Sequence, residues 1–207
     1  MVRTHPQWLG AREVVRSGRI GELRAADCFF SFFNRDPANV RNRPDMGGGA
    51  LLDIGCYAVN LSRFVFGAEP RRVLGLVERD PEWGVDRLTS GVLEFEAGRA
   101  TFNCSTQLAP YQRMQFFGTR GRVEVEVPFN APTDRPTRLL VSEGGGPPEA
   151  LEFPACDQYT IQGDLFSRAV REGGEQPIPL EDALHNMAAI DAIFRSARTG
   201  AWEVPAA

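Results

Sequence analysis

The spacing of apolar positions changes period along the chain. Apolar residues at helical spacing in Pro6–Ser17 predict a short amphipathic helix that Gly18 ends. Gly21–Asn34 is rich in aromatic residues and predicts a long strand. A polar loop with two prolines follows, and the strongly apolar stretch from Gly47 to about Phe66 then predicts a buried helix that closes at Gly67.

From Arg71 to about Pro154 the pattern consists of short segments separated by glycines, as is typical of strands. Charged and apolar residues alternate strictly in Arg122–Val127, so one face of that strand is expected to contact water. Gly144–Pro148 is interpreted as a hairpin loop and not as a domain linker. The expected strands are Arg72–Arg79, Leu88–Glu96, Ala100–Leu108, Met114–Phe117, Val123–Val127 and Leu139–Ser142.

Two helices are expected after these strands, over Thr160–Arg171 and Leu180–Thr199, with Gly200 as the C-cap of the second. Helix, strand, helix, a run of strands and two helices together indicate an α+β fold, with a largely antiparallel sheet covered by helices on one face. A length of 207 residues suits one such core, so 1–207 is interpreted as a single domain. No G-x-G-x-x-G follows a strand and precedes a helix, so the sequence shows no dinucleotide-binding βαβ unit.

Composition narrows the classes of function. The net charge of -4 argues against a nucleic-acid partner, which favours a basic face, and no apolar run reaches the ~18 residues of a membrane helix. The N-terminus lacks the apolar stretch of a signal peptide, so a cytoplasmic location is expected. All 23 basic residues are arginine, which excludes a Schiff-base or P-loop lysine in this chain.

The cysteines and histidines do not suggest a metal site. There are four cysteines and two histidines, and neither histidine is near a cysteine in the sequence, so no metal is expected. The cysteines are far apart, and each lies among apolar or small residues. We therefore expect buried, reduced thiols at Cys28, Cys56, Cys104 and Cys156.

The helix predicted after the glycines carries a row of polar residues. Asp53, Tyr57 and Asn60 are spaced i, i+4 and i+7, so they lie on one helix face. Asp53 and Tyr57 could form a structural hydrogen bond in the core. A buried carboxylate is costly unless it is paired, and titratable groups beside a glycine-rich turn also suit proton transfer. The residues alone leave both interpretations open.

The segment Gly47–Asn60, with D-I-G-x-Y at Asp53–Tyr57, resembles the C-terminal domain of the glucose–fructose oxidoreductase, inositol dehydrogenase and rhizopine-catabolism (Gfo/Idh/MocA) family. With a tyrosine at its last position, the motif resembles that of the subgroup that includes xylose dehydrogenases and dihydrodiol dehydrogenase. Individually weaker similarities extend over essentially the whole chain, at His5–Gln7, Ser17–Glu22, Asp36–Pro44, Phe117–Gly121 and Asn186–Ala197.

The resemblance implies an open-faced sheet like that of the glyceraldehyde-3-phosphate dehydrogenase C-terminal domain, with helices facing a preceding Rossmann domain. It implies that the bare sheet face pairs with another subunit in a homo-oligomer, commonly a homodimer. By the same resemblance, Tyr57 is the acid/base at a sugar oxygen and Asp53 is the orienting carboxylate. The other residues that it implies are Arg41, Arg43 and Asn60 for substrate and Gly48 and Gly49 for cofactor.

The implied reaction is hydride transfer at a carbon of a sugar or polyol, with NADP or NAD as cofactor. Tight binding of the nucleotide to this chain alone is not expected, because the family's nucleotide domain and its E-K-P lysine are not recognisable in the sequence. The partner implied is a separate nucleotide-binding domain. Two alternatives stay open: a non-catalytic dimerisation or ligand-binding module, and an inactive truncated fragment.

Overall fold

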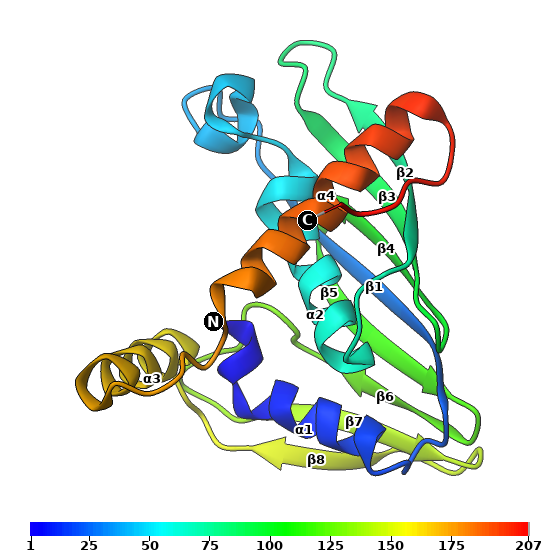
Figure 1. Cartoon of the computed structure of the whole chain (residues 1–207), viewed down its shortest axis with the longest axis vertical. Coiled ribbons are helices and arrows are strands. Elements are labelled where there is room, and N and C mark those ends of the chain that lie inside the picture. Colours follow the sequence, from blue (N-terminus) through cyan, green and yellow to red (C-terminus); the bar gives the residue numbers. More distant parts are fainter. Residues whose placement is uncertain (207) are drawn as a thin grey trace.

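The computed structural model describes residues 1–206, which form a single eight-stranded sheet with helices packed on one face (Figure 1). The strand order is β2-β3-β4-β1-β5-β6-β7-β8, in which β1 and β4 are parallel and every other neighbouring pair is antiparallel. The strands are β1 (Leu23–Phe33), β2 (Arg72–Arg79), β3 (Asp86–Glu94), β4 (Arg99–Ser105), β5 (Gln107–Gly118), β6 (Gly121–Val125), β7 (Thr137–Glu143) and β8 (Glu149–Phe153).

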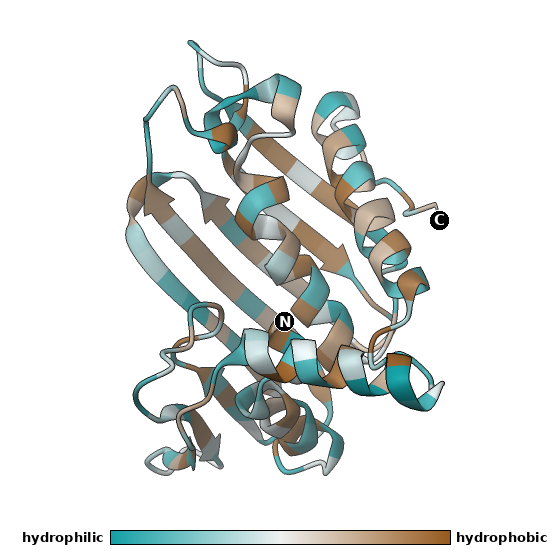
Figure 2. Cartoon of the chain, turned by 90° about the vertical axis from the view of Figure 1, so that its left-hand side faces the viewer, coloured by the Kyte–Doolittle hydropathy of each residue, from teal (hydrophilic) through white to brown (hydrophobic). Residues whose placement is uncertain are grey.

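Three of the four α-helices cover the same face of the sheet (Figure 2). α1 packs on β6, β7 and β8, α2 packs on β1, and α4 packs on β2. α3 projects from the body and buries only Gln158 (Figure 1). The helices are α1 (Pro6–Arg16), α2 (Cys56–Phe66), α3 (Gln158–Glu172) and α4 (Leu180–Thr199), with short turns η1 (Val2–Thr4), η2 (Val40–Asn42), η3 (Pro44–Met46) and η4 (Leu51–Gly55). The α+β prediction is confirmed.

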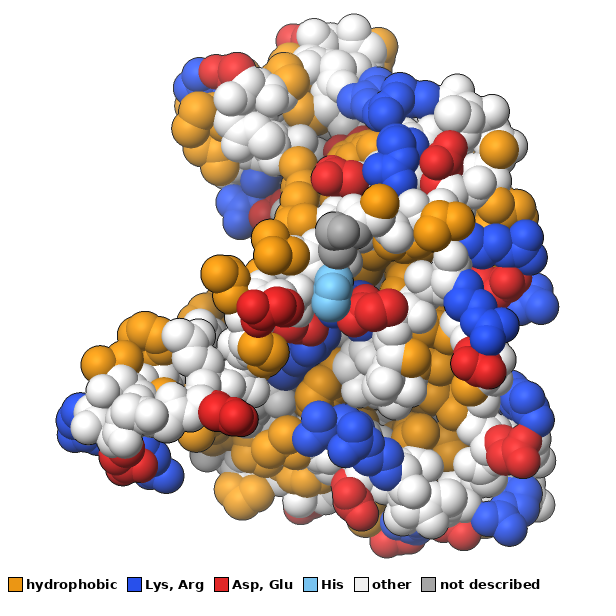
Figure 3. All heavy atoms as spheres, in the orientation of Figure 1, with side chains coloured by type: hydrophobic (Ala, Val, Ile, Leu, Met, Phe, Trp, Pro, Cys, Tyr) orange, Lys and Arg blue, Asp and Glu red, His pale blue; other side chains and the backbone are white. Residues whose placement is uncertain are grey.

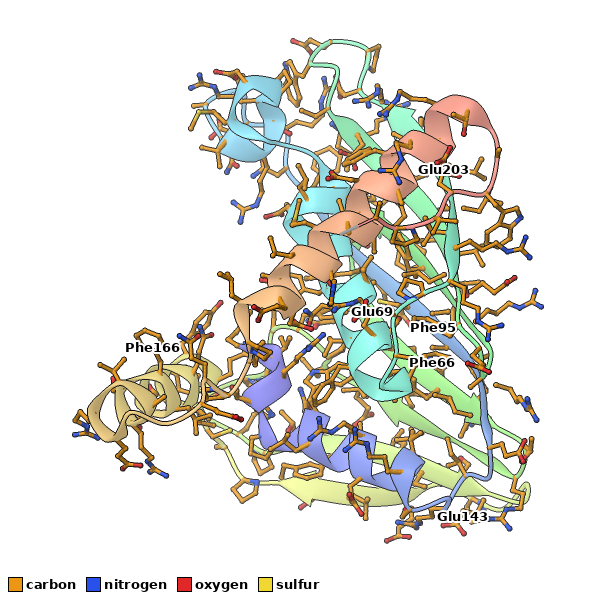
Figure 4. The ribbon with its side chains drawn as sticks, in the orientation of Figure 1. Phe66, Glu69, Phe95, Glu143, Phe166 and Glu203 are labelled. Atoms are coloured by element: carbon orange, nitrogen blue, oxygen red, sulfur yellow. The ribbon has the colours of Figure 1, made fainter. Side chains whose placement is uncertain are left out.

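Large aromatic side chains fix the helices to the sheet. Trp8 of α1 is fully buried, meets the Phe116 ring edge-on at 6.2 Å, and donates from Nε1 to the Pro128 carbonyl at 2.7 Å. At the end of α2, Phe66 stacks on Phe95 with ring centroids 4.3 Å apart (Figure 4). Burying a side chain of this size stabilises the fold by about 1.5–3 kcal/mol, so these contacts determine where the two helices lie.

Three of the expected helices, now α1, α3 and α4, are confirmed to within about two residues at each end, whereas the helix expected from Gly47 begins at Leu51. Gly67 and Gly200 end α2 and α4 in the left-handed conformation, with φ of 64° and 69°, as C-cap glycines do. The helix expected from Gly47 is not uniformly α-helical, because η4 is a π-helical turn that leads into α2. Such turns occur frequently at functional sites.

Strand boundaries differ more from the prediction. The segment expected as Ala100–Leu108 divides at Thr106, where the chain leaves β4 and β5 begins one residue later. β5 is then much longer than expected, because it pairs with β1 from Gln107 to Gly118. The short polar strand β8 was missed, although the hairpin loop before it is confirmed by β7–β8 pairing.

The expectation that one face of β6 contacts water was wrong at Glu124. This carboxylate is only 6% exposed. It accepts hydrogen bonds from Arg113 and, at 2.7 Å, from the Gln115 amide, both on the neighbouring strand β5. A charged residue in an alternating strand can therefore be buried when its cross-strand neighbours cover and neutralise it.

The helical stretch Pro44–Phe66 is long and apolar enough, by length and composition, to span a membrane. The expectation that no segment is long enough for a membrane helix considered only uninterrupted apolar runs, and this stretch also contains polar residues. Within the fold, however, 61% of its apolar window is buried. Val59 and Leu61 of α2 are fully buried in the core between the helices and the sheet. Its apolar character is therefore accounted for as that of a core helix.

Candidate functional site

Asp53 and Tyr57 both line one cavity of about 290 Å³. Their i, i+4 spacing predicted that they lie on neighbouring turns of one helix face. The wall is built from parts of the chain that are far apart in sequence: the N-terminus, β1, the loop before the glycines, η4, α2, the connection between β6 and β7, and the start of α3. The molecule is hollowed on the side where the N-terminus and α3 lie (Figure 3). The lining residues are Met1, Phe30, Phe32, Arg41, Asp53, Ile54, Tyr57, Phe129, Asn130 and Tyr159.

A carboxylate from another element fixes the start of the helix that carries the site. Ala50 gives this helix no side-chain cap. Asp86 of β3 accepts hydrogen bonds from the Leu51 backbone N–H at 2.7 Å and from the Thr89 hydroxyl at 2.9 Å. Asp86 is 2% exposed, and burial raises its pKa. The sheet therefore supplies the acceptor that an N-cap residue ordinarily provides.

The glycines before the helix are required by the packing of this chain on itself. A Cβ on Gly48 would lie 2.6 Å from the Arg41 carbonyl oxygen. A Cβ on Gly49, whose φ is +122°, would lie 1.9 Å from Asp86 Oδ1. Neither position therefore accommodates a side chain. Gly48 also lines a second cavity of about 480 Å³ between this loop and α4. The predicted cofactor role of Gly48 and Gly49 stays a prediction.

Arg41 makes an ion pair with Asp53 across the loop. Its Nε donates to Asp53 Oδ2 at 2.7 Å, and its guanidinium lies 5.9 Å from the centre of the Phe32 ring. Asp53 therefore does not form the structural hydrogen bond with Tyr57 that was one of the two interpretations. Within residues 1–206, the Tyr57 hydroxyl has no protein hydrogen-bond partner, so it is free to bind a ligand.

Tyr57 lies in an aromatic wall. Its ring is 6.4 Å from Phe30 and 5.8 Å from Phe129, and these two phenylalanines stack on each other at 4.4 Å. Burial is the main cause that raises the pKa of Tyr57, and Cys56, Tyr159 and Asp53 raise it further, while Arg41 opposes them. The free phenol titrates near ~10, so Tyr57 is protonated at neutral pH and suited to donating a proton.

The cysteines are all free thiols, as expected. Cys28 and Cys104 are buried, whereas Cys56 and Cys156 are only partly buried, which corrects the expectation for these two. Burial raises the pKa of Cys56, next to Tyr57, to about 11. It is therefore a thiol at neutral pH, and the chemistry of the cavity depends on the oxygen and nitrogen groups.

Two residues of the predicted substrate set lie outside the cavity. Asn60 accepts a hydrogen bond from Arg3 Nε at 2.7 Å, because η1 covers the next turn of α2. Arg43 pairs with Asp45 at 2.8 Å in the exposed loop. The sequence predicted the same substrate role for Arg41 and Arg43, but in the structure only Arg41 lines the cavity.

Of the lining residues, the sequence assigned only Arg41, Asp53 and Tyr57 to the site; the missed ones include three from distant segments. Phe129 and Asn130 belong to the connection between β6 and β7, and Tyr159 is the second residue of α3. No local pattern marks them, because their place in the site depends on where the sheet and α3 bring these segments. Their only signal in the sequence is an aromatic or amide residue in an otherwise polar stretch.

Comparison with known proteins points to one family. Residues 8–124 match the GFO/IDH/MocA C-terminal domain. An uncharacterised oxidoreductase of Rhizobium meliloti is 43% identical over 98% of this chain and 62% of the relative. D-xylose 1-dehydrogenase (NADP(+)) 2 of Haloferax volcanii is 35% identical over 97% of this chain and 62% of the relative.

A solved structure with the same fold is that of the aldose-aldose oxidoreductase from Caulobacter crescentus, complexed with glycerol. The TM-score is 0.87 at 26% identity, and the match covers 98% of this chain and 62% of that protein. The chain therefore spans about three fifths of the length of the proteins that it matches. With a family match over more than half of its residues, this chain belongs to the GFO/IDH/MocA family and corresponds to its C-terminal domain.

Proposed function

We propose that this chain is the substrate-binding part of an oxidoreductase that uses NADP or NAD and acts on a sugar or polyol. Tyr57 exchanges a proton with the substrate oxygen, and Asp53 orients the substrate. The observation that carries the proposal is the convergence of Asp53, Tyr57 and Arg41 on one cavity with an aromatic wall. The names of the relatives from H. volcanii and C. crescentus support the substrate class.

The contacts suggest a role for each group. The protonated Tyr57 donates to the oxygen of a bound carbonyl and so stabilises the charge that develops there during reduction. In the opposite direction Tyr57 must accept a proton, and that requires its pKa to fall. In this chain, Arg41 is the cation whose charge lowers the pKa of Tyr57. A second cation would have to come from outside residues 1–206.

The nucleotide, when bound, supplies or accepts the hydride. Residues 1–206 form no βαβ dinucleotide-binding unit, because the parallel strands β1 and β4 are separated in the chain by β2 and β3. The close approaches at Gly48 and Gly49 are made by Arg41 and Asp86 of the chain itself, which accounts for both glycines without a nucleotide. Without such a unit the described residues do not fit the nucleotide, and we place the NADP or NAD site in a separate domain.

The test joins this chain behind the portion of the R. meliloti relative that it does not match, and measures sugar-dependent formation of NADPH. Tyr57→Phe removes the proton donor, so kcat is expected to fall by about 10²-fold or more, with KM changed little. Tyr111→Phe is the matched control, because Tyr111 is half exposed on β5 and does not line the cavity. A folded Tyr57→Phe chimera that binds NADPH and is as active as the unsubstituted chimera would disprove the role of Tyr57.

A further inference from the structure

The ion pair between Arg41 and Asp53 leaves part of each side chain available to a ligand. Both residues line the cavity, and they are joined through Arg41 Nε and Asp53 Oδ2 at 2.7 Å. Within the described residues, the two Nη atoms of Arg41 and Oδ1 of Asp53 have no protein hydrogen-bond partner. The cavity therefore presents hydrogen-bond donors on a rigid planar group beside a carboxylate acceptor.

The charges of the lining side chains cancel. Arg41 and Asp53 are the charged side chains among the described lining residues, and they carry opposite signs. Arginine binds phosphate and carboxylate groups through charge-assisted hydrogen bonds, and the neighbouring Asp53 carboxylate repels such an anion. This cavity has the donors for such a group but not the net positive charge.

Size and shape restrict the ligand further. A volume of about 290 Å³ lies just below the range of roughly 300–1,000 Å³ for small-molecule sites. The stacked pair Phe30 and Phe129, with Tyr57 beside it, forms an apolar surface that contrasts in chemical character with the ion pair. One sugar-sized ring, with C–H groups on one side and hydroxyl groups on the other, matches both surfaces.

We propose that the cavity selects neutral, unphosphorylated polyols of about one monosaccharide, and that the Arg41–Asp53 pair sets this selectivity. Arg41 donates to the oxygen of one hydroxyl group, and Asp53 accepts a hydrogen bond from its neighbour. The pair thus binds two adjacent hydroxyl groups and disfavours an anion. This inference rests on the proposed function, since it concerns the same cavity, and it assigns Asp53 a role in specificity beside that in orientation.

The test measures ligand binding to the chain itself, without nucleotide, by ligand-observed NMR titration at low ionic strength. The probes are D-glucose and D-glucose 6-phosphate, which differ by one anionic group. The wild-type chain is expected to bind glucose more tightly than its phosphate. Asp53→Asn leaves Arg41 uncompensated, so the affinity for the phosphate should rise about tenfold, which corresponds to about 1.4 kcal/mol, while that for glucose falls.

The matched control is Asp45→Asn, which removes the same charge from the Arg43–Asp45 pair of the same loop, outside the cavity. It should leave both affinities unchanged. Tighter binding of the phosphate to the wild-type chain, or an equal gain in Asp45→Asn, overturns the selectivity proposal and leaves the proposed function intact. Absence of glucose binding to folded wild-type chain overturns it as well, and the NADPH assay of the chimera then decides the proposed function independently.

Discussion

At the scale of single residues, His5 joins two segments that the sequence separates widely. Its Nδ1 accepts a hydrogen bond from the Gln7 backbone N–H at 3.2 Å and so caps α1. Its Nε2 lies 3.3 Å from the sulfur of Cys156, just before α3. Because Nδ1 is an acceptor, the neutral ring carries its hydrogen on Nε2 and donates it towards that sulfur. Protonation of Nδ1 would place two N–H groups against each other and remove the cap.

His5 predicts a pH dependence of stability. The side chain is 1% exposed, and burial lowers its pKa from the ordinary value of 6.5. The unfolded chain then binds more protons than the folded one, so the free energy of unfolding decreases as pH falls below about 6.5 and through the folded-state pKa. His5→Asn keeps a capping acceptor without titrating in this range, so this slope should largely disappear. Urea unfolding between pH 5 and 8 measures it.

The control for that experiment is His185→Asn, which changes the other histidine of the chain, at a position on α4 with 43% side-chain exposure. This variant should retain the wild-type slope. If the slope is lost in His185→Asn and kept in His5→Asn, the assignment to His5 is wrong.

At the scale of elements, the geometry of the site depends on how the start of α2 is anchored to the sheet. η4 carries Asp53 and leads directly into the turn with Tyr57. A Cβ on Gly55 would lie 2.7 Å from Cys104 Sγ of β4, so the turn lies directly against the sheet. Asp86 holds the first backbone N–H from β3. These contacts explain how a π-helical turn that follows three glycines is held in place.

Asp86→Ala is expected to lower the free energy of unfolding by about 1–3 kcal/mol, because it leaves the buried Leu51 N–H without a partner. Asp86→Asn keeps an acceptor oxygen and should cost less. Burial raises the pKa of Asp86, so the folded state favours its protonated form and this group's contribution to stability decreases as pH rises. The deficit of the Asn variant should therefore become smaller with rising pH. Urea unfolding of both variants tests this, and equal stability of Asp86→Ala and wild type would refute it.

At the scale of the whole molecule, the helices cover one face of the sheet and leave the other face bare (Figures 1 and 2). Strand register places Phe29, Phe33, Tyr111 and Leu76 on this bare face, and Phe33 and Leu76 are 62% and 71% exposed. Exposed apolar residues also occur on α3 and α4, among them Phe166 (Figure 4). We propose that the bare face pairs two copies of the chain and that α3 and α4 face the separate nucleotide domain.

Pairing through the bare face predicts that Phe29→Glu converts a dimer into a monomer, halving the mass measured by light scattering. The substituted carboxylate would be buried without a partner at the interface. Leu9→Glu is the control, because Leu9 is 43% exposed on α1, at the helical face. It should remain dimeric. A wild-type chain that is monomeric at high micromolar concentration would contradict the proposal.

Local sequence patterns were sufficient to predict the helices of this protein and the two central residues of its site, Asp53 and Tyr57. Apolar spacing and the terminal glycines located α1 and α4 because hydrogen bonds within a helix connect near neighbours in sequence. The spacing of Asp53 and Tyr57 placed them on adjacent turns for the same reason. The motif around them also identified the family, since a family match covers the same segment.

The tertiary structure decided which distant residues complete the site. Arg41 and Arg43 are two residues apart and chemically identical, yet only Arg41 lies where it meets Asp53. Asp86, Asn130 and Tyr159 reach the helix or the cavity through strand pairing and the placement of loops. Such contacts depend on the pairing of strands that are far apart in the chain. The periodicity of one segment shows which side chains face the core but not which strand the segment pairs with.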